Sequence, residues 1–373
     1  MINFDNSAAS FPKPASVSKA VYEAVSRFGG NPGRSGHKLS ASAAQKVFEV
    51  RSAAAEMFGA QVENVAFTLN CTYALNMAIK GLAKSGGNLV ISDHEHNAVA
   101  RPVFKLWKSR GIGFSVAAAG ENNDETLSNF DRLINEKTCA VVCTAASNVT
   151  GRIMPLKRLK KLCESRGVPL IADGAQGCGV LDLKVGADAD IICASGHKGL
   201  YGPCATGLFI TSGKYTPDTI IEGGTGATSA QLEQTGQLPE MLESGTLNTC
   251  AIIGLGEGIR FVKKQTPQRI LAHERALCRQ LEKELENARG VVFYEREYER
   301  VGVTAFNIGA MHSEEVAQKL ADKGFALRGG LQCAAVTHTA LKTKEQGVVR
   351  FSPSVFNTPQ QVAALARTVR NLA

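Results

Sequence analysis

The residue best suited to chemistry in this sequence is Lys198, which stands in the glycine-rich segment Ser195-Gly196-His197-Lys198-Gly199. The segment follows the apolar run 191–194, and open α/β sheets bind their ligands at such strand ends. Burial and neighbouring cations lower the pKa of a lysine, and the neutral amine can then form a Schiff base. An exposed loop lysine is the alternative for this position taken alone.

An acid and a threonine also stand where apolar runs end. Asp173 follows the run 169–172, where its carboxylate could pair with the protonated pyridine nitrogen of a cofactor or could cap a helix. Thr72 follows the run 65–69 and opens a helical pattern, whose free N–H groups suit a phosphate. The alternative for Thr72 is a plain helix N-cap.

A pair of histidines follows a further apolar run. His94 and His96 come after the run 88–92, and the imidazole of His96 could stack on a cofactor ring. Two histidines do not complete a zinc site, and no other His or Cys pair has a suitable spacing, so we expect no metal. Together with the lysine, the acid and the threonine, His96 would stand at the end of one of four successive strands.

The elements that must position these groups alternate between apolar runs and helical patterns up to about residue 246. Most runs are apolar throughout, which is typical of strands covered on both faces, so we predict a mainly parallel α/β sheet. The seven runs are 65–69, 88–92, 114–118, 140–144, 169–172, 191–194 and 207–211.

Beyond residue 246 the strands and helices are fewer and mixed, which predicts a smaller α+β domain. We therefore expect a large domain over 15–245 and a small domain formed by 246–373 and an N-terminal arm over 1–14. The patterns of the small domain predict a helix that ends at Gly290, helices over 313–323 and 359–372, and strands over 291–294, 304–308, 325–328 and 348–352.

The composition is that of a folded protein, since 44% of the 373 residues are hydrophobic and 20% are charged. The net charge of +8 comes from interleaved acids and bases. The densest basic stretch, 157–161, lies on a helical pattern, so we expect a solvated face and no nucleic-acid binding. No apolar run reaches 18 residues and the N-terminus does not read as a signal peptide, so we expect a cytoplasmic protein without membrane contact, whose ten cysteines are reduced thiols.

Over nearly its whole length the chain resembles the class V, fold type I family of pyridoxal phosphate (PLP) enzymes, and within it the cysteine desulfurase and selenocysteine lyase group. The resemblance implies the PLP-dependent transferase fold of type I, with a seven-stranded, mainly parallel sheet. The segments that carry it, in chain order, are Phe4 to Ala9 with Pro12, Asn31 to His37, Glu95 to Asn97, Ser147 to Gly151, Asp173 to Gln176, Ser195 to Lys198, Glu243 to Thr249, Arg350 to Ser352 and Phe356 to Thr358.

Carried over position by position, the resemblance implies roles around the cofactor ring. Lys198 would form the Schiff base and carry the proton between the substrate Cα and the cofactor. Asp173 would bind the pyridine nitrogen, and His96 would stack on the ring. Gln176 would reach the phenolic oxygen.

The resemblance also implies residues for the phosphate and the substrate. Asn148 and Arg350 would bind the substrate carboxylate beside the cofactor, and the planar guanidinium of arginine matches a carboxylate. Thr246, in the segment Glu243-Ser244-Gly245-Thr246, resembles the residue that reaches the phosphate from a second subunit, so a homodimer is implied. The phosphate ligands from the same subunit would be Thr72, Ser195, His197 and the backbone N–H of Cys71.

Cys333 decides which reaction the resemblance implies. It stands in a segment from Arg328 to Ala335 that is similar to the short cysteine loop of desulfurases, whose cysteine attacks the substrate sulfur and becomes a persulfide. Such a thiol needs a reachable loop and a cationic neighbour, which Gly329-Gly330 and Arg328 could supply. A buried, inert cysteine is the alternative. Gln332 stands where better-known members have histidine, so thiol activation would differ here.

The resemblance therefore predicts a PLP-dependent cysteine desulfurase that converts L-cysteine to L-alanine and passes the sulfur through Cys333 to an acceptor protein or thiol. A selenocysteine lyase stays open, because it shares the scaffold. A class V aminotransferase is less favoured, since its half-reaction needs no such cysteine. The alternative from a different class is a non-catalytic partner in sulfur trafficking that keeps the fold.

Overall fold

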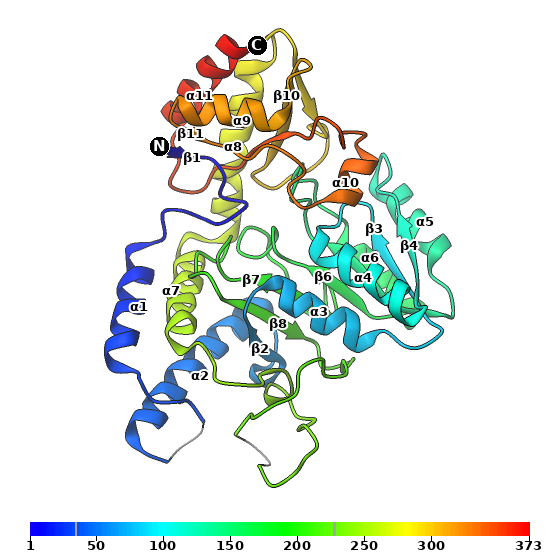
Figure 1. The fold of residues 1–373 in the computed structure, drawn as a ribbon, viewed down its shortest axis with the longest axis vertical. Helices are drawn as coiled ribbons and strands as arrows, with labels where there is room; N and C mark the ends of the chain where they lie inside the picture. Colours follow the sequence, from blue (N-terminus) through cyan, green and yellow to red (C-terminus); the bar gives the residue numbers. More distant parts are fainter. Residues whose placement is uncertain (34–35, 227–228) are drawn as a thin grey trace.

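The large domain is built around a seven-stranded sheet, as predicted (Figure 1). The computed structural model describes residues 1–33, 36–226 and 229–373, so Arg34 and Ser35 of one family-like motif lie outside the described residues. The strands agree with the predicted runs to within two residues. They are β2 (Val65–Thr68), β3 (Asn88–Ser92), β4 (Gly113–Ala117), β5 (Thr138–Thr144), β6 (Leu170–Asp173), β7 (Ile191–Ser195) and β8 (Gly207–Thr211).

The strand order in this sheet is β2-β8-β7-β6-β5-β3-β4. Neighbouring strands from β7 to β4 are parallel, whereas β8 is antiparallel to both of its neighbours, β7 and β2. All residues of β6, β7 and β8 are buried, because helices cover both faces of the sheet. The prediction of a mainly parallel α/β sheet is thus confirmed.

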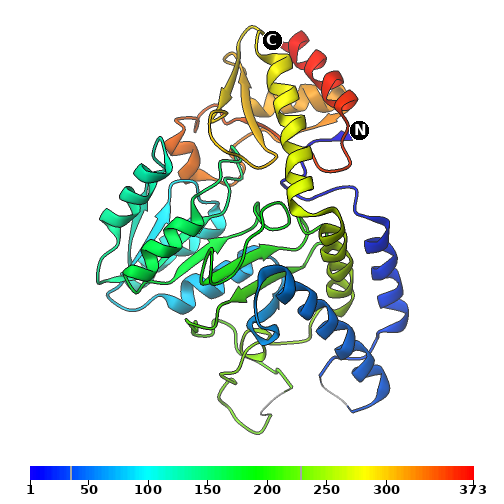
Figure 2. The same cartoon turned by 180° about the vertical axis from the view of Figure 1, so that it is seen from behind.

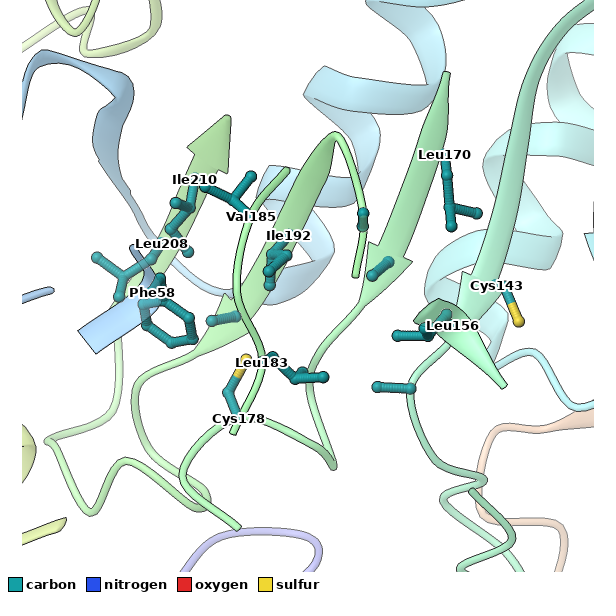
Figure 3. Packing of buried hydrophobic residues seen from close by; sticks show 14 of the residues in the cluster. Phe58, Cys143, Leu156, Leu170, Cys178, Leu183, Val185, Ile192, Leu208 and Ile210 are labelled. Atoms are coloured by element: carbon teal, nitrogen blue, oxygen red, sulfur yellow. The ribbon is translucent and has the colours of Figure 1, made fainter. Parts of the chain in front are cut away.

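Two hydrophobic cores hold the helices on the sheet. One face is covered by α3 (Cys71–Leu82) and α4 (Asn97–Arg110), with Leu75 and Val103 among the buried contacts. On the other face, Phe58 of α2 and Leu156 of α6 belong to the same core as Ile192 and Leu208 of the sheet (Figure 3). The helices of this second face are α2 (Lys38–Phe58), α5 (Asn123–Leu133), α6 (Leu156–Ser165) and α7 (Thr249–Gln265).

The small domain has an antiparallel sheet in the order β12-β10-β9, covered by helices around a core of its own. The N-terminal arm joins this domain, because β1 (Ile2–Asn3) pairs with β11 (Phe325–Ala326) and Phe4 is part of the core. The remaining elements are β9 (Val291–Tyr294), β10 (Thr304–Ile308), β12 (Val349–Phe351), α8 (Pro267–Leu285), α9 (Ser313–Asp322), α10 (Ala335–Ala340) and α11 (Pro359–Leu372).

The packing of α7 bears on where the large domain ends. This helix lies against α1 (Ala15–Arg27) and α2, as Figure 2 shows from behind. Its residues Ile252, Leu255 and Ile259 belong to the core of the large sheet. We therefore propose that the boundary lies at Thr266, between α7 and α8, and not at residue 246, while the arm over 1–14 stays with the small domain.

Two surface features complete the fold. The basic stretch 157–161 lies on α6, where we expected a solvated face. That expectation is wrong for Lys160, which is 2% exposed and pairs with Asp190 at 3.2 Å. A lysine at this depth is held by its counter-charge. Within the described part of the chain, no helix is long and apolar enough to cross a membrane.

Candidate active site

A cavity of about 230 Å³ between the two domains collects most of the residues that the sequence singled out. It opens at the carboxyl ends of the parallel strands, where open α/β sheets bind ligands. The small domain contributes Arg328, Gln332 and Arg350 to its lining. The large domain contributes Cys71, Thr72, His96, Asn148, Asp173, Gln176, Ser195, His197 and Lys198.

The four strands that carry the first predicted groups are not successive, so that prediction is wrong. In the chain, β4 and β5 stand between β3 and β6, and in the sheet β8 lies between β2 and β7. The antiparallel β8 contributes its amino end at this edge. Gly207 stands at that end, where a Cβ would lie 2.5 Å from the carbonyl carbon of Asn70. The lack of a side chain at Gly207 therefore leaves room for the turn before α3.

The turn that follows β7 carries Lys198 and is fastened by the N-terminal arm. The backbone N–H of Ser10 and the Nζ of Lys13 donate to the carbonyl of His197, at 3.1 and 2.8 Å. Burial lowers the pKa of Lys198 although the charge of Asp173 opposes this, which shifts the lysine toward the neutral amine. The structure thus does not place Lys198 on an exposed loop.

His197 and Ser195 lie together beside this turn. The Ser195 hydroxyl is 3.2 Å from Nδ1 of His197. Burial lowers the pKa of His197 to about 4, and the nearby charges of Lys198 and Lys13 act in the same direction. His197 is therefore neutral near pH 7, and its ring nitrogens and the serine hydroxyl can each accept or donate a hydrogen bond.

Asp173 ends β6 and is 2% exposed. Its Oδ1 accepts the backbone N–H of Ala175 at 2.9 Å and the thiol of Cys71 at 3.4 Å. A turn follows Asp173 rather than a helix, so the alternative of a helix cap is wrong. The second carboxylate oxygen is not used by these contacts and is free to accept from a ligand.

The helix α3 begins at the edge of the cavity. Its N-cap is Asn70, whose side chain accepts from the backbone N–H of Tyr73 at 3.0 Å, so the reading of Thr72 as the N-cap is wrong. Thr72 is the second residue of the helix and is exposed. Within the described structure the N–H groups of Cys71 and Thr72 have no partner, as is usual for a first helical turn, and they suit an anion.

His96 begins the next helix, α4, as its N-cap. Its Nδ1 accepts the backbone N–H of Ala98 at 3.0 Å, which assigns the ring proton to Nε2. Burial lowers the pKa of His96 to about 4, against the opposing charge of Asp173. A neutral, fixed imidazole therefore lies at the cavity.

Arg350 of the small domain contacts Asn148 of the large domain in the cavity. Arg350 is 2% exposed, and it donates from Nη1 to the Asn148 carbonyl at 2.9 Å and from Nη2 to Asp5 at 2.6 Å. Two buried polar atoms there, the Nε of Arg350 and the Oδ1 of Asn148, have no hydrogen-bond partner among the described residues. Gln176 is also tied to the arm, since its Nε2 donates to the Ser7 carbonyl at 3.0 Å.

Cys333 and Thr246 lie outside the lining of this cavity. Cys333 is exposed at its edge, with its sulfur 3.9 Å from Nη2 of Arg328, so the alternative of a buried cysteine is wrong. Thr246 lies in a different pocket, together with Phe67 and Leu69, and its hydroxyl is 3.3 Å from the side chain of Asn31. A single chain therefore does not bring Thr246 to Lys198.

Sequence reasoning missed a buried ionic cluster next to the cavity. His94 contacts Asp93 at 2.6 Å and Glu295 at 3.0 Å, and Glu295 also binds Arg152 at 3.0 Å. His94 is thus held in an ion pair between the domains. No local pattern marks Glu295, because it lies far from His94 in the chain. In the described ranges no group of three or more His, Cys, Asp or Glu side chains is arranged to hold a metal ion.

Comparisons with known proteins find matches over nearly the whole chain. The family model described as Aminotransferase class-V matches residues 2–365. A probable cysteine desulfurase of Methanothermobacter thermautotrophicus is 29% identical over 99% of this chain and 94% of its own length. A cysteine desulfurase of Escherichia coli O157:H7 is 31% identical over 98% of this chain and 92% of its own. The apo structure of a cysteine desulfurase from Thermococcus onnurineus NA1 has a TM-score of 0.91 at 29% identity, covering 100% of this chain and 94% of that one.

Proposed function

Since the chain belongs to the class V aminotransferase family, we propose that this enzyme is a PLP-dependent cysteine desulfurase. It would convert L-cysteine to L-alanine and pass the sulfur through Cys333 to an acceptor. One observation carries the proposal: the exposed thiol of Cys333 stands at the edge of a cavity that also holds Lys198 and Asp173. An aminotransferase would need the lysine and the acid but not the thiol.

The donor set of the cavity fits PLP at both ends. The N–H groups at the start of α3 that lack a partner within the described structure, with the hydroxyl of Ser195 and the ring of His197, suit a phosphate. Asp173 would take the ring nitrogen with the carboxylate oxygen that its present contacts leave free. When bound, PLP supplies an aldehyde for the substrate amine and a ring that withdraws electrons from the bonds at Cα.

Lys198 would hold the cofactor and then move the proton at the substrate Cα. Burial lowers the pKa of its amine, which raises the fraction of neutral Nζ that can accept that proton. Arg350 would orient the substrate through its carboxylate, because its buried Nε–H lacks an acceptor within the described structure. The unpartnered Oδ1 of Asn148 is itself an acceptor, so Asn148 would contribute to carboxylate binding through its Nδ2, which has a second hydrogen besides the one donated to Gln332. The neutral ring of His96 would pack on the cofactor and limit its movement.

Cys333 would perform the sulfur transfer. A bond forms between its Sγ and the substrate sulfur, and the bond from that sulfur to carbon breaks with its electron pair left on carbon. That carbon and Cα are then protonated, and L-alanine leaves. Cys333 is left as a persulfide, and an acceptor protein or thiol takes the outer sulfur atom. Arg328, 3.9 Å from Sγ, would stabilise negative charge on the sulfur atoms during the attack.

The position of Thr246 supports a homodimer. It lies outside the cavity of its own chain, beside the partly exposed side chains Leu69 and Ile221. We propose that Thr246 reaches the phosphate in the partner subunit, so each site needs both chains.

The test is the formation of alanine and sulfide from L-cysteine by the purified, PLP-loaded protein with a thiol reductant. We expect equal amounts of the two products, and selenocysteine under the same conditions measures the preference between sulfur and selenium. Cys333→Ala should lower sulfur release by at least about a hundredfold, because a covalent nucleophile is lost. Cys204→Ala, which removes another exposed thiol, should leave the rate unchanged. Undiminished sulfur release by Cys333→Ala would contradict the persulfide step.

A further inference from the structure

Cys333 lies in a tight turn whose backbone is unusual for its residues. The N–H of Ala334 donates to the carbonyl of Leu331 at 2.9 Å and closes a four-residue turn around Gln332 and Cys333. Both central residues have positive φ angles, +40° and +55°. Positive φ at both positions is the mark of a type I′ turn, which favours Asn and Gly, whereas other residues lose free energy there. Contacts outside the turn must therefore stabilise it.

The side chain of Gln332 provides such contacts within the small domain. It is 3% exposed, and its Nε2 donates to the carbonyls of Val348 and Arg328 at 2.8 and 3.2 Å. With both amide hydrogens used, its Oε1 accepts from Nε2 of His338 at 3.1 Å. The other nitrogen of His338 is 2.8 Å from the Thr343 hydroxyl, and burial lowers the pKa of His338, so the ring is neutral.

The large domain holds the backbone of the same turn. The Nδ2 of Asn148 donates to the carbonyl of Gln332 at 2.8 Å, and the N–H of Asn97 donates to the carbonyl of Cys333 at 2.7 Å. Asn148 lies in the cavity, and Asn97 directly follows His96. The turn is thus fastened to both domains, while the thiol itself stays exposed.

From these contacts we infer that Gln332 is a positioning residue, which fixes the Cys333 thiol at the edge of the cavity through its buried amide and exchanges no proton with it. Both amide hydrogens are held by backbone carbonyls, and the amide oxygen accepts from His338, so the side chain has no N–H left to donate to the sulfur. The role in catalysis rests on the proposed function of Cys333, whereas the anchoring itself is a property of the fold.

The experiment compares Gln332→Met, which keeps the length of the side chain but not its hydrogen bonds, with Leu331→Ala in the same turn. Leu331 is 43% exposed, so it serves as the matched control. On the PLP-loaded protein we would measure hydrogen exchange over 329–335, the absorbance change on binding L-cysteine, and alanine formation in a single turnover. Binding and chemistry are thereby separated.

For Gln332→Met we expect faster hydrogen exchange in the segment and a single-turnover rate at least about tenfold lower, because misplacing a reacting atom by ~1 Å can cost ~100-fold. PLP content and the affinity for L-cysteine should be unchanged, which a general loss of structure would not allow. Leu331→Ala should match the wild type in every measurement. A Gln332→Met protein with the wild-type rate would overturn the inference.

A second variant, Gln332→Gly, distinguishes the effect of the side-chain hydrogen bonds from the effect of the positive φ angle in the turn. It also replaces the first variant if Gln332→Met folds poorly. Gln332→Gly adopts positive φ without cost but has no side chain, so we expect the same loss of rate, and a retained rate would overturn the inference. The pH midpoint for alkylation of Cys333 should be the same in all variants, and a shifted midpoint would show direct action of the amide on the thiol. If the wild type forms no alanine, the proposed function fails. Hydrogen exchange over 329–335 in the wild type and the Gln332 variants then tests by itself whether Gln332 anchors the turn.

Discussion

Replacing Glu295 by glutamine would remove the central negative charge from the ionic cluster between the domains. Glu295 accepts from His94 at 3.0 Å, from Arg152 at 3.0 Å and from the Thr150 hydroxyl at 2.5 Å. The side chains of His94 and Glu295 are 3% and 10% exposed, so water cannot take over these contacts. The amide would leave two buried cations with one carboxylate, that of Asp93.

The expected loss follows from the pKa of His94. Burial on its own lowers this pKa, but the bonds to Asp93 and Glu295 outweigh burial and raise it from 6.5 to about 9. A rise of that size corresponds to about 3 kcal/mol, shared between the two carboxylates. The contact with Arg152 adds to the share of Glu295, and removing one partner of a buried pair costs ~3–5 kcal/mol. We therefore expect Glu295→Gln to lower the free energy of unfolding by about 3 kcal/mol.

The loss should depend on pH in a defined direction. The folded pKa of His94 is raised, so its stabilisation is complete below pH 6.5 and is lost as the pH rises through about 9. Burial raises the pKa of Glu295, but its bonds to His94, Thr150 and Arg152 lower it to about 2, so its contribution is complete above pH 4.5 and is lost as the pH falls through about 2. The effect of Glu295→Gln should be largest between pH 4.5 and 6.5 and smaller above 9.

Urea denaturation followed by circular dichroism, at about pH 6 and about pH 9.5, measures this difference. The control is Glu299→Gln, since Glu299 is 73% exposed and its pair with Arg275 should contribute less than about 1 kcal/mol. A loss below about 1 kcal/mol for Glu295→Gln at pH 6, or the same loss at both pH values, would refute the reasoning.

Two further predictions concern the substrate and the second subunit. Arg350→Lys should raise the KM for L-cysteine about tenfold or more, because an ammonium group cannot form the fork of a guanidinium, and alanine formation at varied cysteine measures it. An unchanged KM would place the carboxylate elsewhere. A mixed dimer of one Thr246→Ala chain and one Lys198→Ala chain should be more active than the average of the two parent variants. In such a dimer one of the two sites holds both the native Lys198 and the partner's native Thr246. Activity of the mixture equal to the average of the parents would show that Thr246 acts within its own chain.

The sheet was predictable because its strands are buried on both faces and so are apolar throughout. The runs 191–194 and 207–211 correspond to β7 and β8, which are wholly buried. The order of the strands was not predictable from the same signal, because uniform apolarity carries no direction and β8 enters the sheet antiparallel between β2 and β7. The expectation of four successive strands was wrong for a different reason, because the runs 114–118 and 140–144, which form β4 and β5, stand between the strands that carry His96 and Asp173.

The site was predictable where its residues stand directly after strands, as Lys198 and Asp173 do. It was not predictable where partners come from distant parts of the chain. Asp5 contacts Arg350, Glu295 contacts His94, and His338 contacts Gln332. Taken alone in the sequence, each of these partners is an ordinary charged or polar residue. The case of Gln332 is the clearest, because the sequence predicted only that thiol activation would differ there and gave no sign that its side chain lies buried among backbone carbonyls.

The charges of the cavity match the ligands of the proposed reaction. Among the described residues of the lining, the guanidinium groups of Arg328 and Arg350 face one carboxylate, that of Asp173. A phosphate and a substrate carboxylate would offset this excess of positive charge in the cavity. The sequence does not indicate the excess, because acids and bases are interleaved along the chain. Asp5 binds Nη2 of Arg350 at 2.6 Å, so in the proposed reaction a substrate carboxylate that takes the fork of Nε and Nη2 would compete with Asp5 for Nη2. In the proposed reaction the N-terminal arm, which carries Asp5 and also fastens the Lys198 turn, would therefore influence both substrate binding and cofactor attachment.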